Sequence, residues 1–92
     1  MRYAIKVTSQ FKRDLKLIKK QGKDLNDLFA VIERLAQGKD LPQKYRDHKL
    51  SGHYKGTREC HIAPDFLLIY EKIDPILVLA LVRAGSHADL FE

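Results

Sequence analysis

Apolar positions recur along the first 37 residues with the period of one strand and then of two helices. Residues 3–7 alternate in polarity, which predicts a short strand. A helical stripe follows, and Thr8 or Ser9 can cap its first turn because a side-chain oxygen there accepts a free backbone N–H. Gly22 is a typical stop for this helix. A second apolar stripe predicts another helix over about residues 24–37.

The second half of the chain changes to strand-like patterns. Residues 39–55 show no clean period, so we predict a surface loop there. Three strand candidates follow at about residues 56–62, 66–72 and 76–82, separated by short turns that contain proline and aspartate. Ser86 can cap a final short helical turn.

The element order β-α-α-β-β-β predicts an α+β fold, in a single domain that spans residues 1–92. Short links between the last three strands favour a mainly antiparallel sheet. We expect two helices on one face of that sheet and a partly open second face.

The chain carries few signs of a membrane or an oxidising compartment. No apolar run approaches the roughly 18 residues typical of a membrane span. The N-terminal stretch is too short and mixed for a secretory signal. Cys60 is the one cysteine, so no internal disulfide can form. These features predict a cytoplasmic protein without a membrane partner.

Positive charge is concentrated in two segments. Residues 1–23 hold eight Lys or Arg and one acid, and residues 44–58 hold five and one, within a net charge of +5. A clustered basic surface is what a phosphate backbone selects. A solvated helix face beside a basic loop would give the same pattern, and composition alone does not separate the two.

The histidines offer acid–base chemistry. His61 ends one strand candidate and Asp65 begins the next, so their side chains are expected to lie close together. His48 lies in the basic loop, and His87 starts the last turn. Imidazole titrates near neutral pH, so paired histidines can remove the proton of a ribose 2′-OH and protonate a departing 5′ oxygen. Cations stabilise the charged phosphorus centre.

Each of these residues also has an ordinary structural explanation. A lone histidine is more often structural than catalytic, and Asp65 after proline is typical of a turn. Arg83 can be a strand-end residue and Phe91 a core anchor. The histidines lack compact ligand spacing, which argues against a metal site. Cys60 is a weak nucleophile candidate because strand alternation places it opposite His61.

Three segments resemble the YafQ-type toxins of the RelE/ParE superfamily. The chain reads YRDHKLSG at residues 45–52, RECHIAPDFLLIY at 58–70 and RAGSHADLF at 83–91. The family patterns are YxDHxLxG, RxxHxxPDWxLIY and RxGxHxxLF. Phe66 stands where the family often has tryptophan, so a hydrogen bond from an indole is in doubt, and His53 is assigned no role.

The resemblance implies a RelE-like fold and the toxin of a bacterial type II toxin–antitoxin system. Such toxins cut mRNA in the A site of the 70S ribosome without a cofactor. A cognate antitoxin silences them, and the complex represses its own operon at operator DNA. Carried over by position, the acid–base set is His48, His61, Asp65 and His87, and the substrate contacts are Arg83, Phe91, Phe66, Lys55 and Arg58.

The expected mechanism is metal-free attack by the 2′-OH, leaving a 2′,3′-cyclic phosphate. His87 is our choice of general acid, Asp65 or His61 of general base, and His48 assists. The same fold resembles ParE-type toxins, which bind DNA gyrase, are not nucleases and generally lack the histidine set. A catalytically silent DNA-binding partner in a repressor complex is a third possibility.

Overall fold

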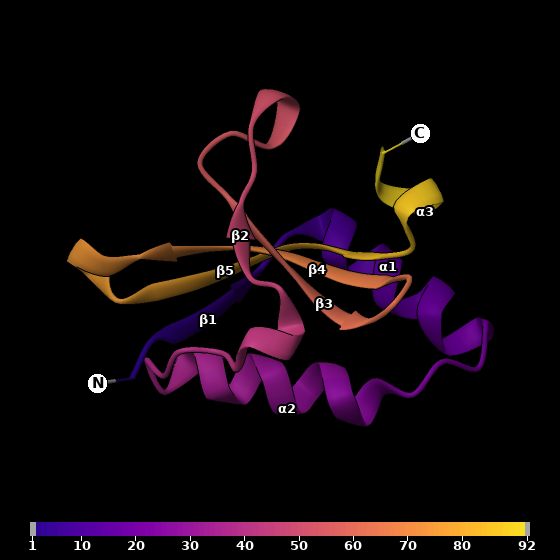
Figure 1. Ribbon diagram of the computed structural model, residues 1–92, viewed down its shortest axis with the longest axis horizontal. Helices are drawn as coiled ribbons and strands as arrows, with labels where there is room; N and C mark the ends of the chain where they lie inside the picture. Colours follow the sequence, from indigo (N-terminus) through magenta and orange to yellow (C-terminus); the bar gives the residue numbers. More distant parts are fainter. Residues whose placement is uncertain (1, 92) are drawn as a thin grey trace.

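The structure, a computed structural model, describes residues 2–91 and is an α+β fold built on a mixed five-stranded sheet (Figure 1). The strand order is β1-β5-β4-β3-β2. The strands are β1 (Ala4–Val7), β2 (His48–Lys49), β3 (Arg58–Ala63), β4 (Phe66–Ile73) and β5 (Val78–Gly85). The helices are α1 (Ser9–Lys20), α2 (Leu25–Ala36) and α3 (His87–Phe91), and short 3-10 turns lie at Gln43–Tyr45, Gly52–Tyr54 and Asp74–Ile76.

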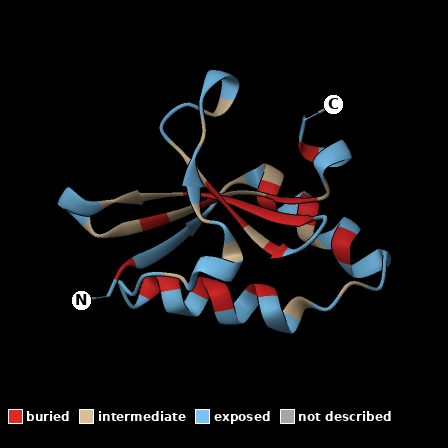
Figure 2. Cartoon of the chain, in the orientation of Figure 1, coloured by how far each residue is buried: buried red, intermediate tan, exposed pale blue. Residues whose placement is uncertain are grey.

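The main core lies between the sheet and the two long helices, as the apolar stripes predict. Phe11 and Ile18 of α1 are buried in one cluster with Leu28 of α2 and with Leu68 and Tyr70 of β4. The buried positions of α2 lie on its sheet-facing side (Figure 2). Both helices therefore pack against one face of the sheet, and the predicted fold class is confirmed.

Both long helices begin at side-chain caps, the first of them at the predicted Thr8. Thr8 accepts a hydrogen bond from the Phe11 backbone N–H and donates another from its hydroxyl to the Val82 carbonyl at 2.7 Å. Asp24 accepts from the Asn26 N–H in the same way. The Thr8 side chain thus fixes the start of α1 directly onto β5.

The first strand completes the sheet beside the last one. β1 pairs in parallel with β5, while β5, β4, β3 and β2 form antiparallel pairs in turn. β1 is an edge strand, and Ile5 and Val7 remain 40% and 42% exposed. None of the helices in residues 2–91 is long and apolar enough to cross a membrane.

Two details of the sheet differ from the sequence prediction. The segment predicted as a plain loop contains β2, which pairs His48 with Glu59 and Lys49 with Arg58. β5 starts later and ends later than expected, because Asp74–Ile76 forms a 3-10 turn and Leu77 adopts a left-handed φ of 50°. Pairing with β4 then continues through a bulge to Gly85.

The second face of the sheet carries a smaller cluster. Leu67 and Ile69 of β4 pack there with Leu90 of α3, and Tyr54 and Val82 lie against them. α3 and the loop that contains Tyr54 rise from this face, on the opposite side of the sheet from α2 (Figure 1). The rest of this side, which we call the open face, carries the histidines.

Candidate active site on the open face of the sheet

Strand register gathers the candidate residues into adjacent rows. One row across the sheet runs through His48, Glu59, Ile69 and Arg83. His61 lies two residues beyond Glu59 on β3 and pairs with Leu67, so it lies in the next row on the same face. The bulge at Val82 sets the Arg83 position, because Ile69 pairs with Arg83 whereas Tyr70 pairs with Leu81.

The orientation of His48 is fixed by the backbone. Its Nδ1 lies 2.7 Å from the Arg46 carbonyl oxygen. A carbonyl only accepts hydrogen bonds, so Nδ1 carries the proton, and in the neutral ring Nε2 is left with a lone pair. That Nε2 lies 3.5 Å from the Glu59 carboxylate. Neutral His48 therefore presents a proton acceptor beside Glu59.

Glu59 is a site residue that the sequence reasoning missed. Its side chain is buried, yet its Oε1 lies 3.3 Å from Nε2 of His61 and 3.5 Å from Nε2 of His48. The Glu59 carboxylate therefore lies between the two imidazole rings. The available signal was strand alternation, because Glu59 and His61 are two positions apart and must share a face.

His87 and Asp65 form a second pair of side chains, next to His61. Nδ1 of His87 donates to Asp65 Oδ1 at 2.7 Å, and the His87 backbone N–H donates to the same oxygen at 2.9 Å. These hydrogen bonds hold the pKa of Asp65 below its ordinary value. The Asp65 carboxylate thus orients the His87 ring through Nδ1, and Nε2 takes no part in this contact.

Aromatic rings connect these groups. The ring centroid of His61 lies 6.1 Å from that of His48 and 5.9 Å from that of His87. Phe91 lies 6.3 Å from His87 and packs edge-on against Tyr54. The structure therefore brings together the four acid–base candidates and Phe91, with Tyr54 as an addition that the sequence did not single out.

Arg83 is held by a buried acid from α1. Asp14 accepts from Nε of Arg83 at 3.0 Å and from Nη2 at 2.8 Å. The hydrogen bonds to Asp14 raise the pKa of Arg83, burial lowers it, and the nearby Tyr54 hydroxyl raises it again. Arg83 thus stays cationic at the margin of the open face.

Two predicted substrate contacts lie on the helix side of the sheet. Phe66 is buried in the main core there, and Arg58 pairs in register with Tyr70 on that same side. Alternation along β3 and β4 therefore turns both side chains away from the histidines. Lys55 is exposed in the loop that rises over the open face.

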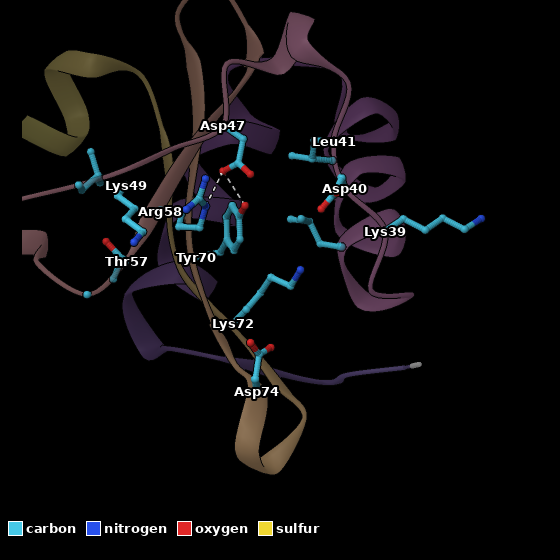
Figure 3. Close-up of a pocket in the computed structure, with 13 residues that line it drawn as sticks. Lys39, Asp40, Leu41, Asp47, Lys49, Thr57, Arg58, Tyr70, Lys72 and Asp74 are labelled. Atoms are coloured by element: carbon cyan, nitrogen blue, oxygen red, sulfur yellow. Dashed lines mark hydrogen bonds and ion pairs between the residues drawn. The ribbon is translucent and has the colours of Figure 1, made fainter.

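Arg58 belongs instead to a cavity of about 630 Å³ on the helix side (Figure 3). Asp47 points to Arg58 and Tyr70 there, accepting from Arg58 Nε at 3.1 Å and from the Tyr70 hydroxyl at 2.6 Å. Asp47 thereby anchors the loop before β2, and alternation then turns the next residue, His48, to the open face.

A smaller hollow of about 440 Å³ lies beside the histidines. His61, Lys44 and Arg46 line it, between the 3-10 turn at Gln43–Tyr45 and the end of β3. Asp27 of α2 also lines this hollow, so two cations and one acid lie there beside the His61 imidazole.

Among residues 2–91, one group has the geometry to hold a metal ion. One donor atom each of His48, Glu59 and His61 lies within 4.8 Å of the others. This set was not expected from the histidine spacing, because β2 pairing brings His48 to β3. Cys60 contributes nothing here, since burial raises the pKa of its thiol to about 12 on the opposite face.

Comparison with known proteins agrees with this arrangement. Residues 3–92 match the family described as the bacterial toxin of type II toxin–antitoxin system, YafQ. The mRNA interferase toxin YafQ of Escherichia coli K12 is 40% identical over 88 residues, covering 95% of this chain and 94% of that protein.

Solved structures agree over the whole chain. The E. coli DinJ–YafQ toxin–antitoxin complex matches with a TM-score of 0.90 and 38% identity, covering 100% of both chains. A metal-bound toxin from Helicobacter pylori matches at 0.89 and 44%, covering 99% of this chain and 100% of that one. This chain belongs to the YafQ family of bacterial toxins of type II toxin–antitoxin systems.

Proposed function

We propose that this chain is an endoribonuclease toxin that cuts mRNA in the A site of the 70S ribosome by metal-free acid–base catalysis. One observation carries the proposal. His87, oriented by Asp65, lies across the open face from His48, with His61 about 6 Å from each. A proton donor and a proton acceptor thus both lie next to His61 on one face of the sheet.

In the proposed reaction each proton that leaves one group is taken up by another. A base takes the proton of the 2′-OH, and that oxygen forms a bond to phosphorus. The bond from phosphorus to the 5′ oxygen breaks, and His87 gives its proton to that oxygen. The products are a 2′,3′-cyclic phosphate and a free 5′-OH. Arg83 stabilises the negative charge on the phosphorus oxygens.

The geometry favours a histidine over Asp65 as the base. A carboxylate whose pKa lies below its ordinary value is a weak proton acceptor. His48 presents a lone pair on Nε2, and Glu59 stabilises the imidazolium that forms. In this proposal Asp65 orients the acid, and His61 lies beside both partners.

An open site supports the proposed dependence on the ribosome. His48 and His87 are about half exposed, at 49% and 54% of their side chains. Such a surface has few groups to align the 2′-OH with the phosphorus atom, and alignment supplies a large share of catalysis. We propose that the ribosomal A site holds the mRNA in that alignment, while Phe91 stacks on a base and Lys55 and Lys44 contact phosphates.

We also propose a cognate antitoxin that silences the chain and that represses the shared operon with it at operator DNA. The support is the likeness to the toxin in the E. coli DinJ–YafQ complex over the entire chain. The exposed basic segment of α1 suits an acidic partner.

The test uses mRNA bound to ribosomes, with wild type and His87→Ala. We expect cleavage in chelator with a 2′,3′-cyclic phosphate end, little cleavage of free mRNA, and loss of at least about a hundredfold in His87→Ala. Glu33→Gln, which removes an exposed ion pair with Arg2 away from the histidines, is the matched control.

Three outcomes would contradict the proposal. Growth arrest that survives His87→Ala points to a gyrase-type toxin. A 5′-phosphate product rules out 2′-OH attack. Loss of cleavage in chelator points to a metal at the cluster of His48, Glu59 and His61. In our scheme added Zn²⁺ instead slows the cut, because it competes for the same nitrogen lone pairs.

A further inference from the structure

Asp14 is a buried acid in the otherwise basic first segment of the chain. It is the one acid in that segment, and it is 5% exposed although α1 is otherwise cationic on its surface. A carboxylate is costly to bury unless hydrogen bonds replace its water. The position of Asp14 therefore needs an explanation beyond charge balance on α1.

Four donors converge on this carboxylate. Nε and Nη2 of Arg83 donate to its two oxygens, and the Ala84 backbone N–H donates at 3.1 Å. Gln10, one turn earlier, donates at 3.2 Å. Burial raises the pKa of Asp14, but these hydrogen bonds outweigh burial and hold it below its ordinary value. Asp14 is thus an anion in a fixed position.

The paired contact fixes the plane of the Arg83 guanidinium. Nε and Nη2 both donate to Asp14, and the Tyr54 hydroxyl lies near the same guanidinium. Arg83 lies in the same row as Glu59, two strands away, so their backbones are roughly 10 Å apart at about 4.8 Å per strand. Ile69 of β4 lies between them in this row, so Arg83 borders the same face of the sheet as Glu59.

We propose that Asp14 is a positioning residue for the cleavage reaction, holding Arg83 so that its guanidinium meets the phosphate as negative charge develops. This inference rests on the proposed nuclease function. Asp14 itself touches no substrate and acts through Arg83. Fixing the guanidinium before the reaction removes the need to order a flexible side chain in the transition state.

A purely structural role would use the same contacts to fasten α1 to β5. The two roles differ in what they change. Loss of a fastening lowers the melting temperature and the fraction of active protein. Loss of positioning lowers the rate of the chemical step in molecules that remain folded and ribosome-bound.

The experiment is a double-mutant cycle on mRNA-programmed ribosomes under single-turnover conditions. The proteins are wild type, Asp14→Asn, Arg83→Gln and the double variant, with Glu33→Gln as an ion-pair control away from the site. We expect Asp14→Asn to lower the maximal rate on the order of tenfold to a hundredfold, with half-saturation within about twofold of wild type. The double variant is expected to be no slower than Arg83→Gln.

A second variant guards against misfolding. Asp14→Glu keeps the charge but moves the carboxylate by one methylene, so the ion pair persists while the guanidinium shifts. The same loss of rate is expected, with a melting temperature near wild type. The NMR signal of the Arg83 Nε–H is expected to be slow to exchange in wild type and fast in Asp14→Asn.

The outcomes separate the two proposals. Wild type that cleaves no mRNA overturns the nuclease function, and the role of Asp14 with it. Active wild type with Asp14→Asn or Asp14→Glu at full rate overturns the role of Asp14 alone. So does a double variant whose loss is the product of the two single losses, because Asp14 would then act independently of Arg83.

Discussion

At the scale of single residues, Cys60 and His61 show how strongly strand alternation divides chemistry. They are neighbours on β3, yet Cys60 is fully buried in the main core and His61 belongs to the open face. Burial raises the pKa of the Cys60 thiol to about 12, so its reactive thiolate form is scarce at neutral pH.

We therefore predict that Cys60 is unreactive in the folded protein. A chromogenic disulfide reagent at pH 8 should label the thiol only after denaturation, and Cys60→Ala should cleave mRNA at the wild-type rate. Rapid labelling of the native protein, or loss of cleavage in folded Cys60→Ala, would contradict this prediction.

The residues of the site differ in whether the sequence around each of them is enough to identify it. His61, Asp65 and His87 could be identified from short motifs, because turns and caps place them within a few residues of a recognisable signal. Glu59 and Asp14 could not be identified from short motifs of this kind. Their importance depends on partners brought close by folding, and Asp14 meets Arg83 across 69 positions.

At the scale of elements, the turn from β5 into α3 places His87. Gly85 ends β5 with φ of 155°, and a Cβ added there would lie 3.4 Å from the Asp89 Cβ and 3.5 Å from Leu90. Both the backbone conformation and the close approach of α3 favour glycine. The shortest of the three α-helices thus depends on a turn that favours glycine.

Gly85→Ala is predicted to shift α3 and impair cleavage. We expect a stability loss of about 1–3 kcal/mol, from the strained backbone and the tight contact, together with a fall in cleavage rate of about tenfold or more. Gly22→Ala is the matched control, since Gly22 also has positive φ but has nothing within 4 Å of an added Cβ. Urea unfolding and single-turnover cleavage separate the two effects, and equal cleavage rates in the two variants would refute the argument.

Element order was predictable where the pattern was long. Both helices and four strands follow from periodicity and caps, and their bounds differ from the structure by a few residues. β2 has two residues, too few for a period, and only its pairing with β3 makes it a strand. The bulge at Val82 was equally hidden, because register depends on the partner strand. Such details of strand pairing decide on which side of the sheet Arg58 lies.

At the scale of the whole molecule, the exposed cations of α1 give its outer surface a positive electrostatic potential that attracts polyanions. Lys12, Lys16 and Lys20 are exposed, whereas the one acid of the helix, Asp14, is buried and neutralised by Arg83. Because Arg83 neutralises Asp14 inside the molecule, the exposed charges on α1 are all positive. Net charge alone does not describe that distribution.

Ribosome binding is accordingly predicted to weaken with salt. A plot of log affinity against log KCl should be linear, with a slope of roughly 0.7–0.9 per phosphate neutralised. Lys12→Gln/Lys16→Gln should reduce the slope by up to about 2. Lys72→Gln is the control, because the Lys72 ammonium lies over the Tyr3 ring on the helix side. Equal slopes in all three proteins would rule out a contact through α1.

The parallel pairing of β1 with β5 has a consequence for the time at which the toxin becomes dangerous. Translation makes β1 and α1 first, but their partners on β5 come about 74 residues later, and His87 follows those. The nascent chain therefore holds neither a closed sheet nor the His87 proton donor until residues 78–87 have been made. The active site thus forms in a single late step of folding, whatever the order in which the earlier elements form.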